Sequence, residues 1–378
     1  MRIHATAAAG LALTLVLGGG LMNGDAHAQP PIPDDVPAVP AETVARLQAA
    51  LDAWSRQPAH RGVTAAVVLQ TGAEWTGAAG LAGLDEPLRP DHLIGIASIT
   101  KTMTGAVILQ LVDEGVVQLD DPVGRWLPPM DNVPPDITVR QLLNHTSGLA
   151  NYTASAALGA AIAEDPARVF QASDLLGFLD APHFAPGERT EYTNTAFLLL
   201  GLVAEAATGR PILELYHQRL WGPRNLTGVF LPLVEEPPAP VAAALGRAGL
   251  VEPLLQPAVL SIGQSAFGLY ADAITVARWG HALFLGDVVT PETQAAMREL
   301  VPAAGNIPGE SGAGLGIRGY QYFDRTEFGH SGGMSFGSSL LLFEPESGAT
   351  VVVLANQGQN AGHFVLAPEL LAIAAGLR

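Results

Sequence analysis

The chain has 378 residues, 48% of them hydrophobic and 15% charged, which is enough for one large domain or for two lobes around shared cores. Its formal net charge of −17 argues against a nucleic-acid-binding protein and against a polybasic membrane-surface protein, because both functions need clustered cations. The sequence has no cysteine, which excludes disulfides, thiolate metal sites and a cysteine nucleophile.

The first 28 residues have the pattern of a signal peptide. Arg2 precedes an apolar run interrupted by glycines, and the segment ends in an A-x-A cleavage pattern at Ala26 and Ala28. We therefore expect cleavage near Ala28 and a mature protein that is periplasmic or secreted, with no stable membrane anchor; an uncleaved anchor is the alternative. Residues 29–44 are rich in proline, which predicts an extended leader.

Residues 45–378 are predicted to form one domain with strands near both ends and a mainly helical middle. Two apolar runs on either side of Thr71 and Gly72 indicate a β-hairpin. The expected helices cover 42–55, 103–117, 272–284 and 364–377, and the expected strands cover 62–70, 74–82, 314–323, 335–345 and 349–356. The predicted fold class is α/β: an antiparallel sheet built from both chain ends and flanked by helices, with an inserted mainly helical lobe at about 105–300.

Lys101 is the only lysine of the chain, and every other long cationic side chain is an arginine. Ser98 lies three residues before it at the predicted start of a helix, so both side chains lie on one helix face, about 5–6 Å apart at Cβ. A neutral lysine amine can accept the proton of a serine hydroxyl, whereas a guanidinium stays protonated. Lowering the lysine pKa from about 10.4 to about 7–8 requires roughly 3–4 kcal/mol. The alternative is that a coding bias toward arginine left one lysine by chance.

Two further motifs accompany this pair. Tyr192 and Asn194 form a Tyr-x-Asn before an apolar helical run, and His330, Ser331 and Gly332 form a His-Ser-Gly at the entry to a strand. In this order and with these separations, the three motifs resemble those of the serine β-lactamase and D-alanyl-D-alanine carboxypeptidase superfamily. The resemblance is to the branch of class C β-lactamases, penicillin-binding DD-peptidases and related esterases.

Flanking segments extend the resemblance. Two segments are similar to sequence segments of that family: NHTSGL at 144–149 and PGERTEYTN at 186–194. The resemblance covers about residues 45–375, and it implies the sheet-and-helical-lobe fold of β-lactamases and DD-peptidases.

The resemblance also implies a role for each matching residue. Ser98 is the expected nucleophile, Lys101 the base or proton relay, and Tyr192 a partner that passes a proton to the leaving group. Which of Lys101 and Tyr192 is the primary base stays open. Asn194 is expected to hydrogen-bond the substrate amide. The backbone N–H groups of Ser98 and Gly333 are expected to form the oxyanion hole.

The third motif departs from the Lys-Thr-Gly that many β-lactamases carry. His330, Ser331 and Gly332 are expected to bind substrate, but an imidazole is charged only if its pKa is raised. The histidine resembles the DD-peptidase and esterase members more than the β-lactamases. Arg318, on the preceding predicted strand, is either a clamp for a substrate carboxylate or a solvated strand arginine.

Three other sequence patterns are weaker evidence for a function. GHSGG at 329–333 fits the nucleophile elbow of α/β-hydrolases, but that fold needs an acid and then a histidine later in the chain, and no aspartate follows Ser331. GLGIRG at 314–319 spells G-x-G-x-x-G without the βαβ unit of a dinucleotide site. No spacing such as H-E-x-x-H is present, so we expect neither a metal nor a cofactor. His145 is interpreted as a structural loop residue, and three tryptophans are interpreted as core or cleft-wall residues: Trp126, Trp221 and Trp279.

The sequence thus predicts an exported serine hydrolase that forms an acyl-enzyme on Ser98. Its expected partner is a small-molecule or peptide substrate (a D-amino-acid peptide, an ester or a β-lactam) and not a nucleic acid. D-alanyl-D-alanine carboxypeptidase-like, peptidase-like or esterase-like activity is favoured, and class C-like β-lactamase activity is the alternative. A catalytically inactive periplasmic binding or sensor relative is the alternative of another class.

Overall fold

The computed structural model describes residues 37–58, 60–246, 249–251, 256–303, 307–334, 337–358 and 362–377. The predicted signal peptide, 1–28, lies outside the described residues. The first helix, α1 (Ala41–Ser55), begins inside the predicted leader, 29–44.

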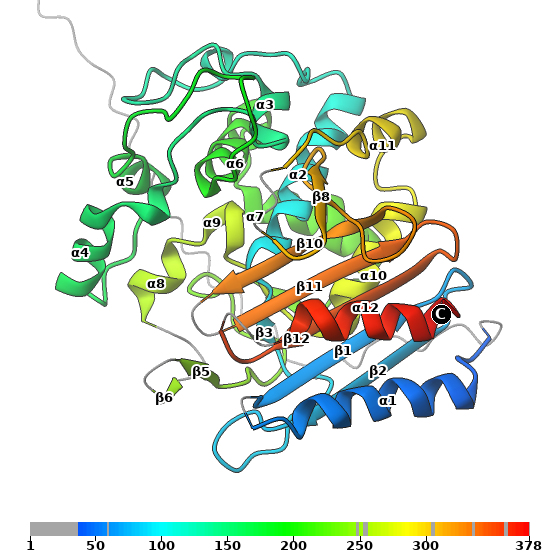
Figure 1. Ribbon diagram of the computed structural model, residues 1–378. Coiled ribbons are helices and arrows are strands. Elements are labelled where there is room, and N and C mark those ends of the chain that lie inside the picture. The colour runs from blue at the N-terminus through cyan, green and yellow to red at the C-terminus, as the bar shows by residue number, and fades with distance from the viewer. Residues whose placement is uncertain are drawn as a thin grey trace, which may run out of the picture. The chain divides into compact units, whose positions relative to one another are not determined.

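A seven-stranded antiparallel sheet forms the centre of the fold (Figure 1). Its strands follow the order β2-β1-β12-β11-β10-β9-β8, so the two ends of the chain meet at the pairing of β1 with β12. The strands are β1 (Gly62–Val68), β2 (Glu74–Gly80), β8 (Glu310–Ala313), β9 (Arg318–Tyr320), β10 (Glu327–Met334), β11 (Gly337–Glu344) and β12 (Ala349–Ala355). This confirms the predicted fold class, including the hairpin around Gly72, which has a φ of +83°.

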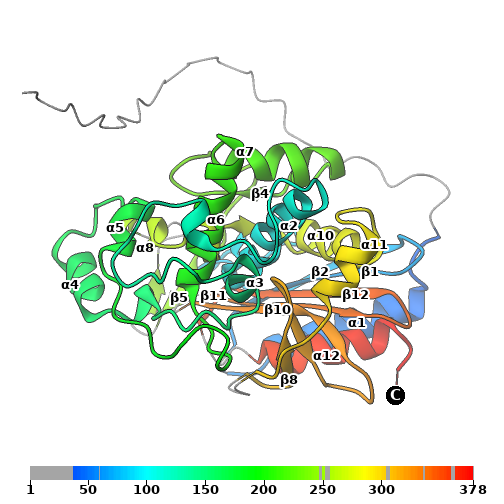
Figure 2. The same cartoon turned by 90° about the horizontal axis from the view of Figure 1, so that it is seen from above.

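Helices cover both faces of the sheet. α1 and α12 (His363–Ala374) pack on one face, and α10 (Ala273–Leu285) packs on the other (Figure 2). The side chains of β11 alternate between the two cores: Leu340 and Leu342 join α1 and α12, whereas Leu341 and Phe343 join the helical part. Because both faces are covered, β11 and β12 are continuous apolar runs in the sequence.

The middle of the chain is mainly helical, as predicted. Its helices are α2 (Thr100–Asp113), α3 (Val139–Leu143), α4 (Ala156–Glu164), α5 (Ala172–Leu176), α6 (Asn194–Thr208), α7 (Ile212–Leu215), α8 (Pro257–Ser261), α9 (Gln264–Phe267), α10 and α11 (Pro291–Met297). Short helical turns of 3-10 type cover Ala97–Ile99 (η1), Val123–Arg125, Tyr152–Ala154 and Gly222–Arg224, and a π-helical turn covers Tyr216–Trp221. Trp221 and Trp279 are buried in the core of this part.

Two small sheets within the helical part were not predicted. One has the order β3-β7-β4, and the other pairs β5 with β6. Their strands are β3 (Ile94–Gly95), β4 (Val229–Phe230), β5 (Ala244–Gly246), β6 (Gly249–Val251) and β7 (Tyr270–Ala271). Strands of two or three residues are too short to show a period of two, so the sequence gives no pattern from which to predict them.

Other boundaries also differ from the predictions. The helix expected over 103–117 covers Thr100–Asp113, because Gly115 takes a left-handed conformation that ends it. The strand expected over 314–323 is limited to β9, since residues 314–317 form the turn between β8 and β9. The G-x-G-x-x-G pattern therefore lies in a β-hairpin.

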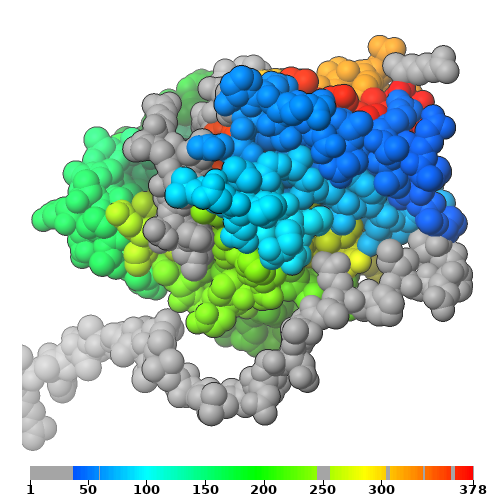
Figure 3. Space-filling model, turned by 90° about the horizontal axis from the view of Figure 1, so that it is seen from below, coloured from blue at the N-terminus to red at the C-terminus, as the bar shows by residue number. Residues whose placement is uncertain are grey.

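Two segments distant in sequence meet next to β3, where Leu93 and Val241 form an isolated β-bridge. On the face that Figure 3 draws, the blue and cyan atoms of the early part of the chain border the yellow-green atoms of its middle. The Leu93 amide donates to the Pro240 carbonyl at 2.8 Å, and the Ala242 amide donates to the Leu93 carbonyl at 3.0 Å. This contact fixes the segment that leads through β3 to Ser98.

Among the described residues, no single helix is long and apolar enough to span a membrane. The helix α6 and the segment Ile212–Arg224, which meet at 79°, reach that length and composition only together. The apolar side chains of α6 are largely buried in the core.

Candidate active site

Ser98 lies at the junction between the central sheet and the helical part. It is in the turn η1, between β3 and α2, and the residue before it, Ala97, has a φ of +48° that non-glycine residues rarely adopt. The Ser339 hydroxyl on β11 donates to the Ile96 carbonyl at 2.8 Å. This hydrogen bond attaches the turn to the sheet.

Lys101 is completely buried in the first turn of α2. Its Nζ lies 2.7 Å from Asn194 Oδ1, 2.8 Å from the Ala266 carbonyl oxygen and 3.2 Å from Ser98 Oγ. Burial lowers the pKa of Lys101 well below its ordinary value, and the positive charge of Arg318 lowers it further. Both effects favour the neutral amine that a general base requires.

Tyr192 reaches Ser98 from the other side. Its hydroxyl donates to Ser98 Oγ at 2.7 Å. Lys101 Nζ and Arg318 Cζ both lie over its ring, at 4.8 and 4.6 Å from the ring centroid. Burial raises the pKa of Tyr192, while the charge of Arg318 and the hydrogen bond with Ser98 act in the opposite direction. The protonated phenol is thus the resting form, and it can donate a proton.

Asn194 is the first residue of α6, which Thr193 caps through its side chain. Its amide oxygen accepts from Lys101, and its amide nitrogen donates to Thr153 Oγ1 at 3.1 Å. In this structure the side chain positions the lysine. The hydrogen bond to a substrate amide that the family resemblance implies stays a prediction.

The third motif lies on β10, where alternate residues face opposite sides of the strand. Ser331, Gly332 and Gly333 line a pocket together with Ser98. Gly332 faces η1, and His330 is 1% exposed and is not among the lining residues. The structure thus places His330 behind the pocket wall.

His330 is held as a neutral imidazole. Its Nδ1 lies 2.6 Å from the Ser331 carbonyl oxygen, which can only accept, so Nδ1 carries the proton. Burial lowers the pKa of His330 well below its ordinary value, and the charges of Arg318 and Lys101 act in the same direction. The third motif therefore supplies no fixed positive charge.

Arg318 is not a solvated strand arginine. It is 4% exposed, lines the pocket and forms a buried ion pair with Glu310 on β8. Glu310 was not singled out in the sequence, because a single acidic residue on a short strand gives no sign that it is buried. The only sign of this ion pair in the sequence is that both residues lie shortly before the third motif along the chain.

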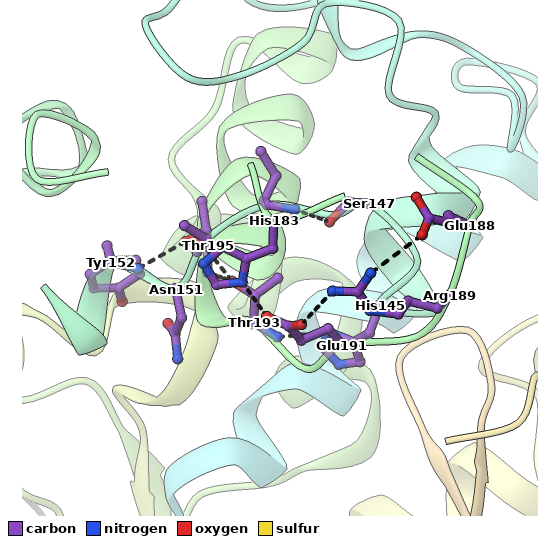
Figure 4. A network of polar contacts seen from close by, with 12 residues as sticks. His145, Ser147, Asn151, Tyr152, His183, Glu188, Arg189, Glu191, Thr193 and Thr195 are labelled. Carbon is purple, nitrogen blue, oxygen red and sulfur yellow. Dashed lines mark hydrogen bonds and ion pairs between the residues drawn. The ribbon is translucent and has the colours of Figure 1, made fainter. Parts of the chain in front are cut away.

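Two loops fix the position of Tyr192. Figure 4 shows residues of both loops, among them His145, Glu191 and Thr193. The Gly187 amide donates to the Thr146 carbonyl at 2.7 Å, and the Glu191 amide donates to the His145 carbonyl at 2.9 Å. The Thr193 amide lies 3.4 Å from His145 Nδ1. These bonds join the segments 144–149 and 186–194.

His145 does more than join the loops. Its ring packs against that of Tyr192 at 4.5 Å between centroids, and it lines the pocket. Burial lowers the pKa of His145 well below its ordinary value, as do the charges of Arg318 and Lys101. A residue interpreted as structural from the sequence is thus also part of the pocket wall.

The pocket in front of Ser98 has a volume of about 800 Å³. Its lining includes polar side chains, such as Ser98, Tyr192 and Arg318, and apolar ones, such as Ile307, Pro308 and Phe364. This size accommodates a small organic substrate. Among the described residues, no three histidine, aspartate or glutamate side chains lie close enough together to form a metal site.

The nucleophile-elbow pattern at 329–333 does not form an elbow. Ser331 lies within β10, and β10 pairs with β11 instead of leading into a helix. Ser331 also lies outside the hydrogen-bonded group formed by Ser98, Lys101 and Tyr192.

The chain resembles known proteins over most of its length. The Beta-lactamase family model matches residues 43–376, which is most of the chain. The chain belongs to this family. The solved structure of a D-stereospecific amidohydrolase from Streptomyces sp. is 29% identical, with a TM-score of 0.75, and the match covers 87% of this chain and 97% of that one.

A second solved structure shows the same fold at lower identity. The D-amino acid amidase from Ochrobactrum anthropi SV3, complexed with D-phenylalanine, has a TM-score of 0.80 at 22% identity, with coverage of 89% and 100%. The match therefore extends over the sheet and the helical part together.

Two relatives match over shorter stretches. Esterase EstB from Burkholderia gladioli is 36% identical over 189 residues, which are 46% of this chain and 47% of the relative. A D-aminopeptidase from Brucella anthropi is 37% identical over 142 residues, which are 37% and 26% of the two chains. The chain thus spans less than half the length of these relatives.

Gly332 provides a test of how closely β10 must approach the turn that carries Ser98. A Cβ atom there would lie 2.5 Å from the Ile96 carbonyl oxygen and 2.9 Å from the Ala97 Cβ. We predict that Gly332→Ala pushes β10 away from η1 and slows labelling of Ser98 by a fluorophosphonate about 100-fold or more, as for the loss of one oxyanion donor. The measurement is the labelling rate followed by mass spectrometry.

The matched control is Gly337→Ala on β11. A Cβ atom at Gly337 would meet only ordinary contacts, the nearest at 3.7 Å. Its labelling rate should stay near that of the wild type. Equal labelling rates for the two variants would show that the close approach of β10 to η1 at Gly332 does not affect the reactivity of Ser98.

Proposed function

We propose that the chain is a serine hydrolase that forms an acyl-enzyme on Ser98 from an amide or ester of a D-amino acid. The observation that carries this proposal is the convergence of Lys101 Nζ and the Tyr192 hydroxyl on Ser98 Oγ, at 3.2 and 2.7 Å. The substrate class is supported by the names of the relatives, which include an esterase, a D-aminopeptidase and a D-stereospecific amidohydrolase.

Lys101 is the base in this proposal. A neutral amine has two N–H donors and one lone pair, and two acceptors, Asn194 Oδ1 and the Ala266 carbonyl, lie within 2.8 Å of Nζ. With both N–H groups engaged there, the lone pair is left for the Ser98 hydroxyl. An arginine at this position could not accept the proton.

The reaction then follows from the positions of three side chains. Ser98 Oγ attacks the substrate carbonyl carbon while its proton moves to Lys101. The oxygen of the tetrahedral intermediate accepts from backbone N–H groups, for which Ser98 and Gly333 are the candidates because both line the pocket. Tyr192 donates its proton to the leaving nitrogen or oxygen as that bond breaks, and regains one from Lys101.

Hydrolysis of the acyl-enzyme completes the cycle. A water molecule attacks the Ser98 ester, and its proton passes to the same Lys101 and Tyr192 pair. The bond between the acyl carbon and Ser98 Oγ breaks, the Ser98 oxygen takes up a proton, and the carboxylic acid product leaves the pocket. No residue needs to move between the two halves, since both use the same hydrogen-bonded group.

Export, as expected from residues 1–28, is a separate proposal. It rests on the sequence pattern that ends at Ala28. N-terminal sequencing of the protein from cell fractions tests it: a periplasmic or secreted chain that begins near residue 29 is expected, and a cytoplasmic chain with an intact N-terminus would contradict it.

The first prediction concerns Lys101→Arg. We expect the variant to fold but to lose acylation of Ser98 by a factor of about 100 or more, because a guanidinium stays protonated and cannot accept the Ser98 proton. The measurement is the burst of labelled Ser98 in the wild type and the variant. Wild-type labelling in the variant would favour the chance retention of one lysine.

Two measurements serve as controls for this variant. Thermal unfolding shows whether the larger guanidinium is accommodated in the buried site. Tyr192→Phe is the matched change at the other partner of Ser98: it keeps the ring that contacts Lys101 and Arg318 and removes only the hydroxyl. It should slow acylation while leaving the ring packing intact. A chain in which Ser98 is never labelled, even in the wild type, would instead be a binding or sensor protein.

The second prediction concerns substrate preference. Since His330 is buried and neutral, the site lacks the fixed charge that a lysine in the third motif would supply. We expect a short-chain nitrophenyl ester or a D-amino-acid peptide to have a higher kcat/KM than a chromogenic cephalosporin. If the cephalosporin had the highest kcat/KM of the three, the preference for esters and peptides would be wrong.

A further inference from the structure

The side-chain amide of Asn194 has two orientations, and they differ in what they offer Lys101. The two ends of an amide group have nearly the same shape, but the oxygen only accepts hydrogen bonds and the nitrogen only donates them. An oxygen next to Lys101 Nζ takes an N–H of the amine and leaves its lone pair for Ser98. A nitrogen in the same place would donate to that lone pair and block it. The reactivity of the base therefore depends on which end of the amide faces it.

A chain of hydrogen bonds behind Asn194 determines this orientation. Asn194 Nδ2 donates to Thr153 Oγ1 at 3.1 Å, and the Thr153 hydroxyl donates to Asn151 Oδ1 at 3.0 Å. Asn151 and Thr153 belong to the turn Tyr152–Ala154 and its N-terminal cap. Neither is among the described residues that line the pocket, so their link to the reacting groups runs through Asn194.

Backbone N–H groups fix the direction of this chain at its far end. The backbone amides of Thr153 and Asn194 both point at Asn151 Oδ1, at 3.4 and 3.2 Å. Because a backbone N–H can only donate, the atom that they share must be the oxygen of the Asn151 amide, and the Thr153 hydroxyl must donate to it as well. The Asn194 N–H lies in the first turn of α6, where it has no acceptor within the helix. One oxygen thus satisfies the helix end and sets the polarity of the chain.

This polarity extends to the base. Because the Thr153 hydroxyl directs its proton at Asn151, it has only lone pairs to offer Asn194 and must accept from it. Asn194 therefore turns its nitrogen toward Thr153 and its oxygen toward Lys101, 2.7 Å from Nζ. The reverse orientation would set the Asn194 oxygen against a hydroxyl oxygen with no proton to share, at the cost of a hydrogen bond.

We propose that Asn151 and Thr153 are positioning residues that hold one orientation of the Asn194 amide. In that orientation the amide oxygen faces Lys101, and the lone pair of the amine stays available to Ser98. This inference rests on the proposed role of Lys101 as the base. It gives the turn Tyr152–Ala154 a part in the reaction although it does not touch the substrate pocket.

The test is Thr153→Val, which removes the hydroxyl and keeps the size of the side chain. Valine offers Asn194 neither an acceptor nor a donor, so nothing at this position distinguishes the two orientations of the amide. We expect labelling of Ser98 by a fluorophosphonate to slow about tenfold or more, the effect of losing one hydrogen bond at the base. Thr153→Ser keeps the hydroxyl and should label at close to the wild-type rate.

The pKa of Lys101 distinguishes a turned amide from a loss of packing. An N–H of Asn194 beside Nζ disfavours the ammonium, so the pKa of Lys101 should be lower in Thr153→Val than in the wild type, by about one pH unit or more. NMR of isotope-labelled lysine measures it, since the chain has one lysine. The other charged and titratable groups around the amine are the same in both proteins: His145, Tyr192, Arg318 and His330.

Thr195→Val is the matched control variant. The Thr195 hydroxyl joins the same turn to α6, because it accepts from the Tyr152 amide at 3.1 Å (Figure 4) and donates to the Ala150 carbonyl at 2.6 Å. Both bonds are made with backbone groups and lie outside the chain from Asn151 to Lys101. This variant should lower the Tm while leaving the labelling rate and the pKa of Lys101 near their wild-type values.

The outcomes are distinct. If Ser98 is never labelled in the wild type, the proposed function fails, whereas the pKa comparison still tests the orientation of the amide. An unchanged pKa of Lys101 in a folded Thr153→Val protein would overturn the inference, as would equal effects of Thr153→Val and Thr195→Val.

Neutron diffraction from wild-type crystals decides the question if Thr153→Val does not fold. The hydroxyl deuteron of Thr153 should point at Asn151, and the amide deuterons of Asn194 should lie on the side that faces Thr153. Amide deuterons on the side of Asn194 that faces Lys101 would contradict the proposal.

Discussion

The burial of one amine governs the arrangement of the active site. Lys101 has no exposure to solvent, so each of its hydrogen-bonding positions must be satisfied within the protein. Asn194 at the start of α6, the Ala266 carbonyl in α9 and Ser98 in η1 provide the partners. The packing of α2 against α6 and α9 thus serves both the stability of the helical part and the reactivity of the serine.

The second constraint is the junction between the sheet and this helical part. β10 can lie against η1 only because Gly332 has no side chain, and Ser339 on β11 holds the Ile96 carbonyl. Ser98 therefore has its base on the helical side and the backbone of β10 on the sheet side. Arg318 lies over the ring of Tyr192 and forms a buried ion pair with Glu310.

Sequence patterns were sufficient for the parts of the fold that are long or chemically distinctive. The apolar strands at both ends predicted the sheet, and the spacing of Ser98 and Lys101, followed by Tyr192, predicted which side chains the structure brings together. The side on which His330 lies depends on the register of β10, and the burial of Arg318 depends on Glu310. Tertiary contacts fix both, and no local pattern encodes them.

The ionisation of Lys101 is the central claim, and the composition of the chain makes it directly measurable. Because there is only one lysine, incorporation of isotope-labelled lysine gives a single side-chain NMR signal to follow against pH. Burial and the charge of Arg318 both lower the pKa of Lys101, so the signal of the folded protein should titrate well below the ordinary value of about 10.4. On unfolding, the pKa obtained from this signal should return to about 10.4. A folded protein in which Lys101 titrates near 10.4 would contradict the account.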